Sequence, residues 1–310
     1  MTDVVLAGCR ALALPAPAAE TLCAADRAVR CCAAAETLLA EHARLFWADA
    51  FGEDLEENGV FTRLDEAARL TGLHRYTVYA LFFLRSAPEM KRRYALRGIS
   101  DEVFCDSFSD FKWKLLETHR LENVWGVFCP GWIAGFFLQQ RFCLGRLEFE
   151  LSNSEYTYEN AGCRLVPGRP LVQVHIPESG PLVYERVLDS YRRAAAFYYN
   201  TFGDGAIPFL TETWMLYPPV KALLPPGNLR RFTSDFAVIA AGPAEEPDDR
   251  WRIFHMPNTD DTARYPEDTS LQRALKAFLL GGGSMGIGTG IFFYRSGSVL
   301  PHTEKEVLEQ

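Results

Sequence analysis

The chain lacks any run of about 20 uninterrupted apolar residues, which is the length that a membrane-spanning helix needs. Its first 17 residues contain no basic start, and Arg10 interrupts the apolar run of residues 4–14. This is not the pattern of a secretory signal peptide. We therefore expect a cytoplasmic protein that does not associate with a membrane.

Patterns typical of metal sites and disulfide frameworks are missing as well. None of the eight cysteines forms a CxxC pair, and the six histidines form neither an HxxxH nor an HExxH motif. Without a secretory signal, the cysteines should be buried, reduced thiols. We predict no structural metal site.

Positive charge is scarce relative to negative charge. The chain has 32 Lys and Arg against 40 Asp and Glu, for a formal net charge of −8. This balance disfavours binding to nucleic acid and favours a small-molecule amine or a peptide as substrate. With 310 residues, 48% of them hydrophobic, the chain is long enough to form two ordinary cores.

Helical periodicity dominates residues 1–125, which we predict to form an all-helical N-terminal domain. The expected helical segments are residues 24–51, 64–71, 76–85 and 101–120. Residues 126–310 change character and are predicted to form an α/β (α+β) domain with a mixed sheet. One more helix is expected at residues 132–139. Apolar and polar residues then alternate, which predicts strand structure over residues 142–151 with a tight hairpin at Gly145-Arg146.

The centre of the second domain reads as strand, turn, helix and strand. Residues 171–176 alternate as an inner strand, with Gln173 and His175 on the face opposite its aliphatic side chains. Proline has no backbone N–H to donate to a strand ladder, so the strand should end at Pro177. The chain then turns between Pro177 and Pro181, a segment that contains one glycine. The other elements expected are a helix over residues 182–202 and a second strand over residues 209–216.

The remaining segments are assigned from the same signals. We expect a polar loop over residues 152–170, a hairpin of strands 236–240 and 251–254, and a helix over residues 270–280. Thr269 and Gln272 have capping-box spacing for that helix, and the glycines from residue 281 end it. The terminus from His302 is expected to be frayed.

Two motifs suggest other functions. Residues 61–79 imitate a helix-turn-helix DNA reader, but the second helix continues into the apolar residues 80–84 and lacks the polar array that base readout needs. The glycines of residues 281–290 could cradle phosphate. They follow a helix and precede a strand, however, the reverse of a phosphate loop, and we interpret them as a mobile connection.

Three side chains are candidates for acid–base chemistry. Glu212 shares a strand face with apolar residues, where burial would make its carboxylate a stronger proton acceptor. It could equally form an ion pair with Arg230 or Arg231. His175 is a second candidate base, or a structural histidine. Tyr217 could give a proton to a leaving thiolate, or could simply pack its ring.

Four segments together resemble a family of bacterial putative acyltransferases with a helical N-terminal domain and a GNAT-like C-terminal domain. They are VHIPESGPL at residues 174–182, TWMLYP at 213–218, LLPPGNLRRF at 223–232 and DTSLQRA at 268–274. The resemblance covers nearly the whole chain. It implies N-acyl transfer from an acyl-CoA, such as acetyl-CoA, to an unidentified amine.

The resemblance also implies where the cofactor lies. Pantetheine would sit between two splayed parallel strands, residues 171–176 and 209–216, and pyrophosphate would sit at the start of the following helix. The residues expected to contact acyl-CoA are Val174, Ile176, Glu178, Ser179, Gly180, Leu182 and Asn228. Glu212 or His175 would then deprotonate the amine, and Tyr217 would protonate the thiolate.

One feature departs from the family pattern. The usual loop carries Arg or Gln, two further residues and then Gly-x-Gly or Gly-x-Ala, whereas this chain has only Gly180 between Pro177 and Pro181. The prolines remove amide donors where pyrophosphate would need them. The alternative is therefore a non-catalytic GNAT-like protein that binds a ligand or regulates.

Overall fold

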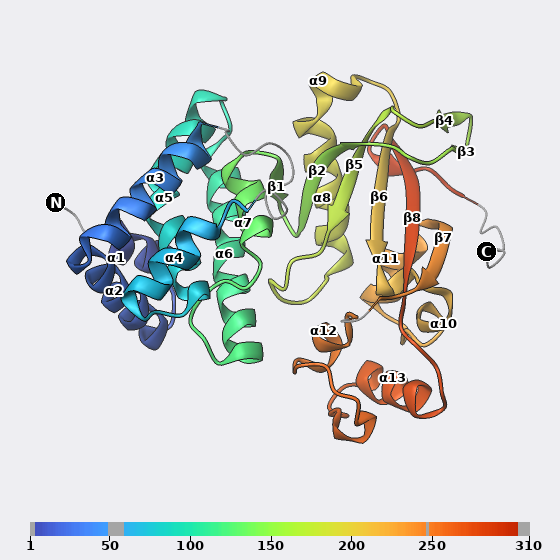
Figure 1. The fold of residues 1–310 in the computed structure, drawn as a ribbon. Helices are drawn as coiled ribbons and strands as arrows, with labels where there is room; N and C mark the ends of the chain where they lie inside the picture. Colours follow the sequence, from blue (N-terminus) through green and yellow to red (C-terminus); the bar gives the residue numbers. More distant parts are fainter. Residues whose placement is uncertain (1–3, 49–58, 246–247, 303–310) are drawn as a thin grey trace. The chain divides into compact units, whose positions relative to one another are not determined.

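The computed structural model of the protein describes residues 4–48, 59–245 and 248–302. The chain divides into two compact units, residues 1–143 and 144–310. The first is helical and the second contains a mixed sheet, which confirms the predicted fold class (Figure 1). The frayed terminus predicted beyond His302 lies outside the described residues, as do residues 49–51 of the helix predicted over residues 24–51.

Helices make up the described secondary structure of the first unit up to residue 137. They are α1 (Val4–Ala11), α2 (Ala16–Cys31), α3 (Ala33–Trp47), α4 (Thr62–Thr71), α5 (Arg75–Leu96), α6 (Asp101–Glu122) and α7 (Pro130–Phe137). Helix α5 is the hub, because α1, α2, α3, α4, α6 and α7 all pack against it. Every residue from Thr77 to Leu84 is buried, so α5 is apolar around its whole circumference.

The helix-turn-helix look-alike is part of this core. Gly72 ends α4 in the left-handed conformation at φ 67°, and His74 caps the start of α5. The local geometry predicted from sequence is therefore present. The helix that would have to read DNA is buried, and this agrees with the weak case for DNA binding that the sequence makes.

His42 lies within an aromatic cluster of the first unit. Its ring is fully buried, with ring centroids 4.5 Å from Phe82, 5.9 Å from Phe61 and 6.2 Å from Phe46. Burial and the charge of Arg63 lower the pKa of His42 from 6.5 to about 4. The folded chain therefore holds this histidine neutral in a pH range where the unfolded chain protonates it.

Acidification should accordingly weaken the helical unit through His42. Between pH 6.5 and 4 the unfolded state binds a proton that the folded state does not, so stability is lost as the pH falls. We expect a shift from pH 7 to pH 5 to cost the wild type about 2 kcal/mol more than the His42→Leu variant. Urea denaturation at both pH values measures this, with exposed His255→Leu as control. Equal pH dependence in wild type and His42→Leu would contradict it.

Neither unit offers a membrane span within the described parts of the chain, since no helix there combines the required length with sufficient apolar character. All eight cysteines are free. Cys9, Cys143 and Cys163 are buried, as expected, but Cys31 and Cys105 are exposed. For those two the expectation of burial is wrong, because each lies on the outer side of an amphipathic helix.

The second unit is built on a twisted sheet. Its strands lie in the order β2 (Leu147–Asn153), β5 (Pro170–His175), β6 (Ile207–Thr213), β8 (Gly286–Arg295) and β7 (Ala237–Pro243), and β9 (Ser298–Val299) also pairs with β8. β5 and β6 are parallel, whereas the other registered pairs are antiparallel. The chain enters this unit at the end of β1 (Arg141–Leu144) through the predicted turn at Gly145.

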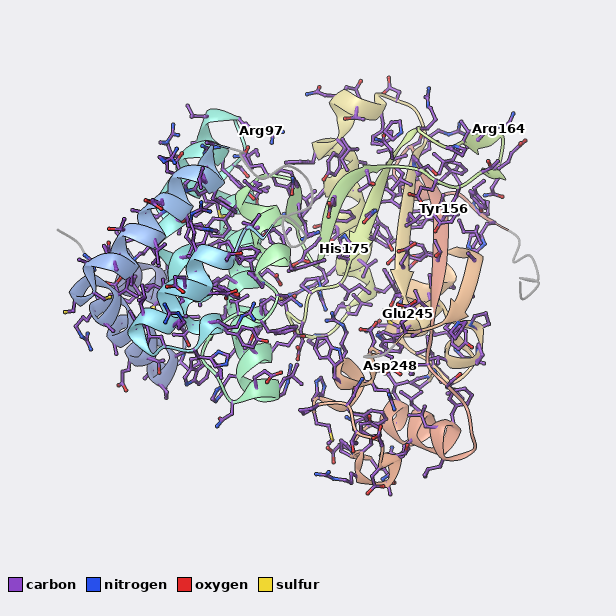
Figure 2. All side chains as sticks on the ribbon, in the orientation of Figure 1. Arg97, Tyr156, Arg164, His175, Glu245 and Asp248 are labelled. Atoms are coloured by element: carbon purple, nitrogen blue, oxygen red, sulfur yellow. The ribbon has the colours of Figure 1, made fainter. Side chains whose placement is uncertain are left out.

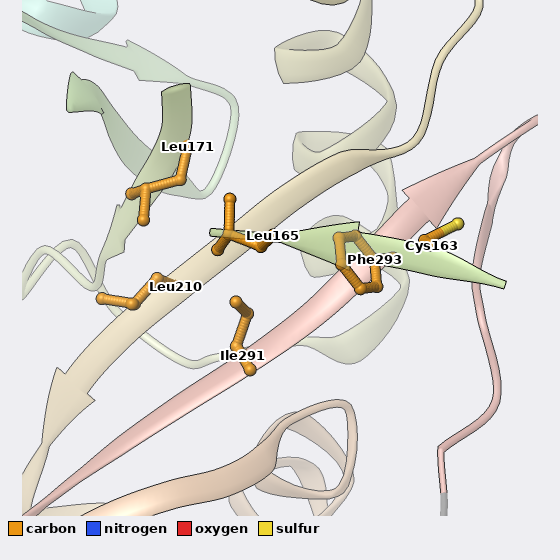
Figure 3. Packing of buried hydrophobic residues seen from close by; sticks show 6 residues of the cluster. All are labelled: Cys163, Leu165, Leu171, Leu210, Ile291 and Phe293. Carbon is orange, nitrogen blue, oxygen red and sulfur yellow. The ribbon is translucent and has the colours of Figure 1, made fainter. Parts of the chain in front are cut away.

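Each face of the sheet carries its own apolar layer. On one face α8 (Tyr184–Phe197) sets the ring of Tyr191 at 4.9 Å from Phe292 and 5.6 Å from Phe209. The opposite face carries a second cluster, shown in Figure 3, of Cys163, Leu165, Leu171, Leu210, Ile291 and Phe293. Successive residues of a strand point to opposite faces of the sheet. The buried aromatic and aliphatic side chains therefore determine the face to which each polar residue of the same strand points.

The loop and the strand hairpin predicted from sequence are wrong in this unit. The supposed loop over residues 152–170 contains the hairpin β3 (Tyr158–Asn160) and β4 (Cys163–Leu165), which supplies Cys163 and Leu165 to the second cluster. Residues 251–254, predicted as a strand, belong to helix α12 (Arg250–Phe254), and β7 pairs with β8 instead. The apolar run was too short for periodicity to separate helix from strand.

A small helical layer completes the unit. It comprises α10 (Pro218–Lys221), α12, η2 (Thr262–Arg264) and α13 (Ser270–Leu280), with a core that includes Val220, Phe254 and Leu275. The predicted capping box is present, because Thr269 and Gln272 exchange side-chain and backbone hydrogen bonds. The short helices α9 (Tyr199–Phe202) and α11 (Asn228–Ser234) flank α8.

The glycine-rich segment is not the mobile connection predicted from sequence. Gly281–Gly283 form the turn after α13, but β8 begins at Gly286 and lies between β6 and β7. Gly286, Gly288 and Gly290 point one way, where a Cβ atom would lie 2.4 Å from Tyr217, from the backbone of Leu216 and from the Leu216 side chain respectively. The glycines allow η1 (Trp214–Leu216) to rest directly on the strand.

Candidate active site

The parallel strands β5 and β6 stay paired over only two residues each, Val172 with Phe209 and Gln173 with Leu210. The next carbonyl of β5, that of Val174, accepts a 2.8 Å hydrogen bond from the Thr211 hydroxyl. β6 then ends at Thr213, three residues earlier than predicted, and turns into η1. The strands thus lose their register at their carboxyl ends, which leaves backbone edges available to a ligand.

The chain leaves β5 through residues 176–183 and enters α8. Gly180 has φ 109°, a conformation that favours glycine. The N-cap Val183 makes no side-chain capping bond, so the first amides of α8 have no partner of that kind. Among the described residues the amides of Ser179, Gly180 and Leu182 donate to no protein acceptor. This turn therefore offers donors to an anion.

Arg146 holds the turn from behind, and sequence reasoning did not single it out. The guanidinium is buried and donates to the carbonyls of Pro177 (3.0 Å), Gly180 (2.6 Å) and Pro181 (3.1 Å). Glu178, in the same turn, directs a carboxylate oxygen to 3.8 Å from His255 Nδ1. Arg146 thus holds the turn through three backbone carbonyls, and the side chain of Glu178 reaches toward His255.

The start of α8 is anchored by a buried carboxylate at the end of α11. Asp235 accepts hydrogen bonds from the hydroxyls of Tyr184 (2.6 Å) and Tyr191 (3.3 Å). Burial raises the pKa of Asp235 to about 6, and the two tyrosine hydrogen bonds oppose that shift. Tyr184 is also covered by Arg231, whose guanidinium carbon lies 4.2 Å from the ring centroid.

His175 is the last residue of β5 and lies where the strands part. Register places it opposite Glu148 of β2, and its Nε2 lies 3.7 Å from a carboxylate oxygen of Glu150. About a quarter of the side chain is exposed. The imidazole is partly exposed, although its Nε2 is buried near the carboxylate, and a carboxylate in this position can orient a general base. Its catalytic role stays a prediction.

Glu212 does not have the environment predicted from sequence. It is exposed rather than buried among apolar neighbours, and its carboxylate accepts hydrogen bonds from Tyr156 (3.2 Å) and Thr289 (3.3 Å). The expectation failed because the strand ends at Thr213, so that Trp214 and Leu216 do not share its face. In the described part of the chain no ion pair joins Glu212 to Arg230 or Arg231, and Arg231 lies 3.2 Å from Glu185 instead.

Tyr217 and Asn228 lie beyond β6. Tyr217 packs its ring over Gly286, where a glycine is required, and this contact is the aromatic packing that the sequence left open. Asn228 is exposed at the first position of α11, directly after Gly227. Val174 and Leu182 are buried, and Ile176 and Ser179 are partly buried. The proton-donor role of Tyr217 and the cofactor contacts of the others stay predictions.

One row of side chains crosses four strands of the sheet on the face opposite α8. Glu148 lies opposite His175 on β2 and β5, and Glu212 lies opposite Thr289 on β6 and β8. The last registered pair between β5 and β6 is Gln173 with Leu210. His175 and Glu212 each follow that pair by two residues on their own strand, so they flank the point where β5 and β6 separate. Figure 2 labels His175 at the end of β5 and Tyr156, which bonds Glu212, on the segment before β3.

Two family descriptions match consecutive parts of the chain. Residues 6–138 match an N-acyltransferase N-terminal domain, and residues 142–292 match a GNAT-like C-terminal domain. No curated protein matches the chain.

Solved structures share the fold over most of the chain. An acyltransferase in complex with decanoyl-CoA and teicoplanin is 22% identical, with a TM-score of 0.69 over 94% of this chain and 86% of its own. An acyltransferase mutant in complex with octanoyl-CoA, and an acyltransferase in complex with CoA and 10C-teicoplanin, give the same identity and TM-score over 91% and 85%.

Proposed function

We propose that this chain, which belongs to the two-domain family joining an N-acyltransferase N-terminal domain to a GNAT-like C-terminal domain, transfers an acyl group from acyl-CoA to an amine. The observation that carries the proposal is the early separation of β5 and β6, with His175 at the point of separation and an amide-rich turn directly after it. Structures of the same fold hold decanoyl-CoA, octanoyl-CoA and CoA. We extend this ligand class to the present chain.

The separated strands suit the pantetheine arm, whose two amide groups need donors and acceptors along an extended path. Where β5 and β6 face each other, they are not paired beyond Gln173 and Leu210. The facing backbone of residues 174–176 and 211–213 can supply such groups, apart from the Val174 carbonyl, which Thr211 already holds. The amides of Ser179, Gly180 and Leu182 and the first turn of α8 then receive the pyrophosphate. Pro177 and Pro181 remove two donors but leave these in place.

The reaction follows from the position of His175. Its imidazole accepts the proton of the acceptor ammonium, directly or through a water molecule, and the neutral amine attacks the thioester carbonyl carbon. Glu150, 3.7 Å away, stabilises the imidazolium that forms. A backbone amide at the free edge of β5 donates to the developing oxyanion. The carbon–sulfur bond then breaks and the thiolate takes a proton from Tyr217. The attacking nitrogen releases its extra proton, which restores the phenol of Tyr217 through solvent, and CoA and the neutral amide leave.

Glu212 has a different part in this scheme from the base predicted from sequence. It is exposed on the same face of the sheet as His175 and its carboxylate is held by Tyr156 and Thr289. A fixed carboxylate beside the base attracts an ammonium group and orients it before proton transfer. We therefore assign the base to His175 and substrate orientation to Glu212.

Isothermal titration tests the function directly. We expect octanoyl-CoA and acetyl-CoA to bind the full chain with micromolar dissociation constants, and free CoA to bind through the same turn. Absence of binding of any CoA species up to millimolar concentration would remove the transferase proposal. The non-catalytic ligand-binding alternative would then be the better description of the chain.

A further inference from the structure

The turn after β5 has the wrong sequence for a conventional phosphate loop, yet its backbone is held in a defined shape by Arg146. This residue follows Gly145 in the turn before β2, 31 to 35 residues away from its carbonyl partners in the sequence. Its side chain is only 8% exposed. A buried guanidinium committed to backbone carbonyls has a cost of desolvation, so the contacts must be well formed to be retained.

The backbone of Arg146 is held in place as well as its guanidinium group. The amides of Arg146 and Leu147 both donate to the hydroxyl of Ser190, at 2.7 and 3.3 Å, and that hydroxyl donates to the carbonyl of Arg186. Ser190 and Arg186 lie on α8. The arginine therefore connects the beginning of β2, the body of α8 and the turn that leads into α8.

The direction of the carbonyls in this turn determines the direction of its backbone N–H groups. In a planar trans peptide the N–H points opposite to the C=O. Because the carbonyls of Pro177 and Pro181 point to Arg146, the amides of Glu178 and Leu182 point away from it. The carbonyl of Gly180 also points to Arg146, but the nitrogen on the other side of that peptide belongs to Pro181 and carries no hydrogen. Pro181 thus removes one outward donor, and the outward amide of Leu182 remains.

We propose that Arg146 is the positioning residue of the CoA pyrophosphate site, replacing the glycine-rich loop of related chains by pulling the turn carbonyls inward and turning its amides outward. This inference rests on the proposed function. The guanidinium contributes in two ways. It fixes the backbone of the turn, and its positive charge behind the peptide dipoles favours an anion on their far side.

The test compares a CoA ligand with one that lacks the pyrophosphate. The full-length Arg146→Gln variant should bind octanoyl-CoA about 10- to 100-fold more weakly than wild type, because charged hydrogen bonds that shape the site are lost. Its binding of octanoyl-pantetheine, which has no pyrophosphate, should stay within about twofold of wild type. Arg146→Lys should fall between, since an ammonium group cannot serve three diverging carbonyls. Arg192→Gln, an exposed arginine of α8 paired with Asp189, is the matched control.

Each outcome has a defined meaning. Equal losses with both substrates would show that Arg146 supports the fold in general, and unchanged octanoyl-CoA binding would show that it does not shape the site; either overturns the proposal. Should Arg146→Gln fail to fold, Gly180→Ala tests the same turn, because an added Cβ meets nothing within 4 Å and acts only through φ 109°. It should weaken octanoyl-CoA but not octanoyl-pantetheine. Wild type that binds no CoA would remove the proposed function itself.

Discussion

Replacing His175 by glutamine should lower kcat for acyl transfer by about 10²- to 10⁴-fold, the range that a general base contributes, while octanoyl-CoA binding changes little. Glutamine keeps the polarity and approximate size of the side chain but cannot accept a proton. Steady-state kinetics together with titration of octanoyl-CoA provides both readouts.

Control variants separate catalysis from general damage. His302→Gln makes the same change at a histidine of the second unit whose Nε2 lies 3.1 Å from the carbonyl oxygen of Ser234, and it should leave kcat unchanged. Glu150→Gln should reduce kcat less than the loss of His175 does, because it removes the partner of the imidazolium and not the base, whereas Glu159→Gln on exposed β3 should be silent. Wild-type rates in His175→Gln would place the base elsewhere.

Placing a methyl group on Gly288 should destabilise the protein by about 3 kcal/mol or more, at the upper end of overpacking costs. The new Cβ would lie 2.4 Å from the backbone carbon and oxygen of Leu216, and backbone cannot rotate aside as a long side chain can. Relief would require η1 to move off β8 and to take the end of β6 with it. Urea denaturation of Gly288→Ala against wild type measures the loss.

The neighbouring strand offers a matched control for that experiment. Gly242 of β7 pairs with Ile287 of β8, next to Gly288 in the chain, but an added Cβ at Gly242 meets nothing within 4 Å. Gly242→Ala should therefore be neutral or slightly stabilising, because alanine restricts the unfolded chain more than glycine does. Similar losses in the two variants would mean that the close approach of Leu216 to β8 does not limit stability.

Local patterns were sufficient for most elements of the chain. The alternation around Val174 and His175 identified β5 and the face of its histidine, and the spacing of Thr269 and Gln272 identified the start of α13. Both signals arise from neighbours within a few residues, so the sequence carries them in full. The segment containing residues 251–254 failed because five helical residues give too little periodicity to exclude a strand.

The environment of Glu212 shows where local reasoning stops. Its alternation with Leu210 correctly predicted a shared face, but burial depended on how far the strand continued and on what covered it. The chain leaves the sheet after Thr213, because the bare face of Gly286, Gly288 and Gly290 accepts η1 there. A glycine segment more than 70 residues away thus decided whether Glu212 was exposed, and no local window contains both.

The sequence alone determined the helical first half, the strand–turn–helix order around Gly180, the position of His175 at a strand end and the resemblance to a two-domain acyltransferase family. These follow from short-range periodicity, turn chemistry and motifs. Only the tertiary structure decided that Glu150 accompanies His175, that Glu212 is exposed and that Arg146 shapes the turn. Each of these depends on strand register or on a contact across more than 20 residues, which side-chain packing sets only when the whole sheet has formed.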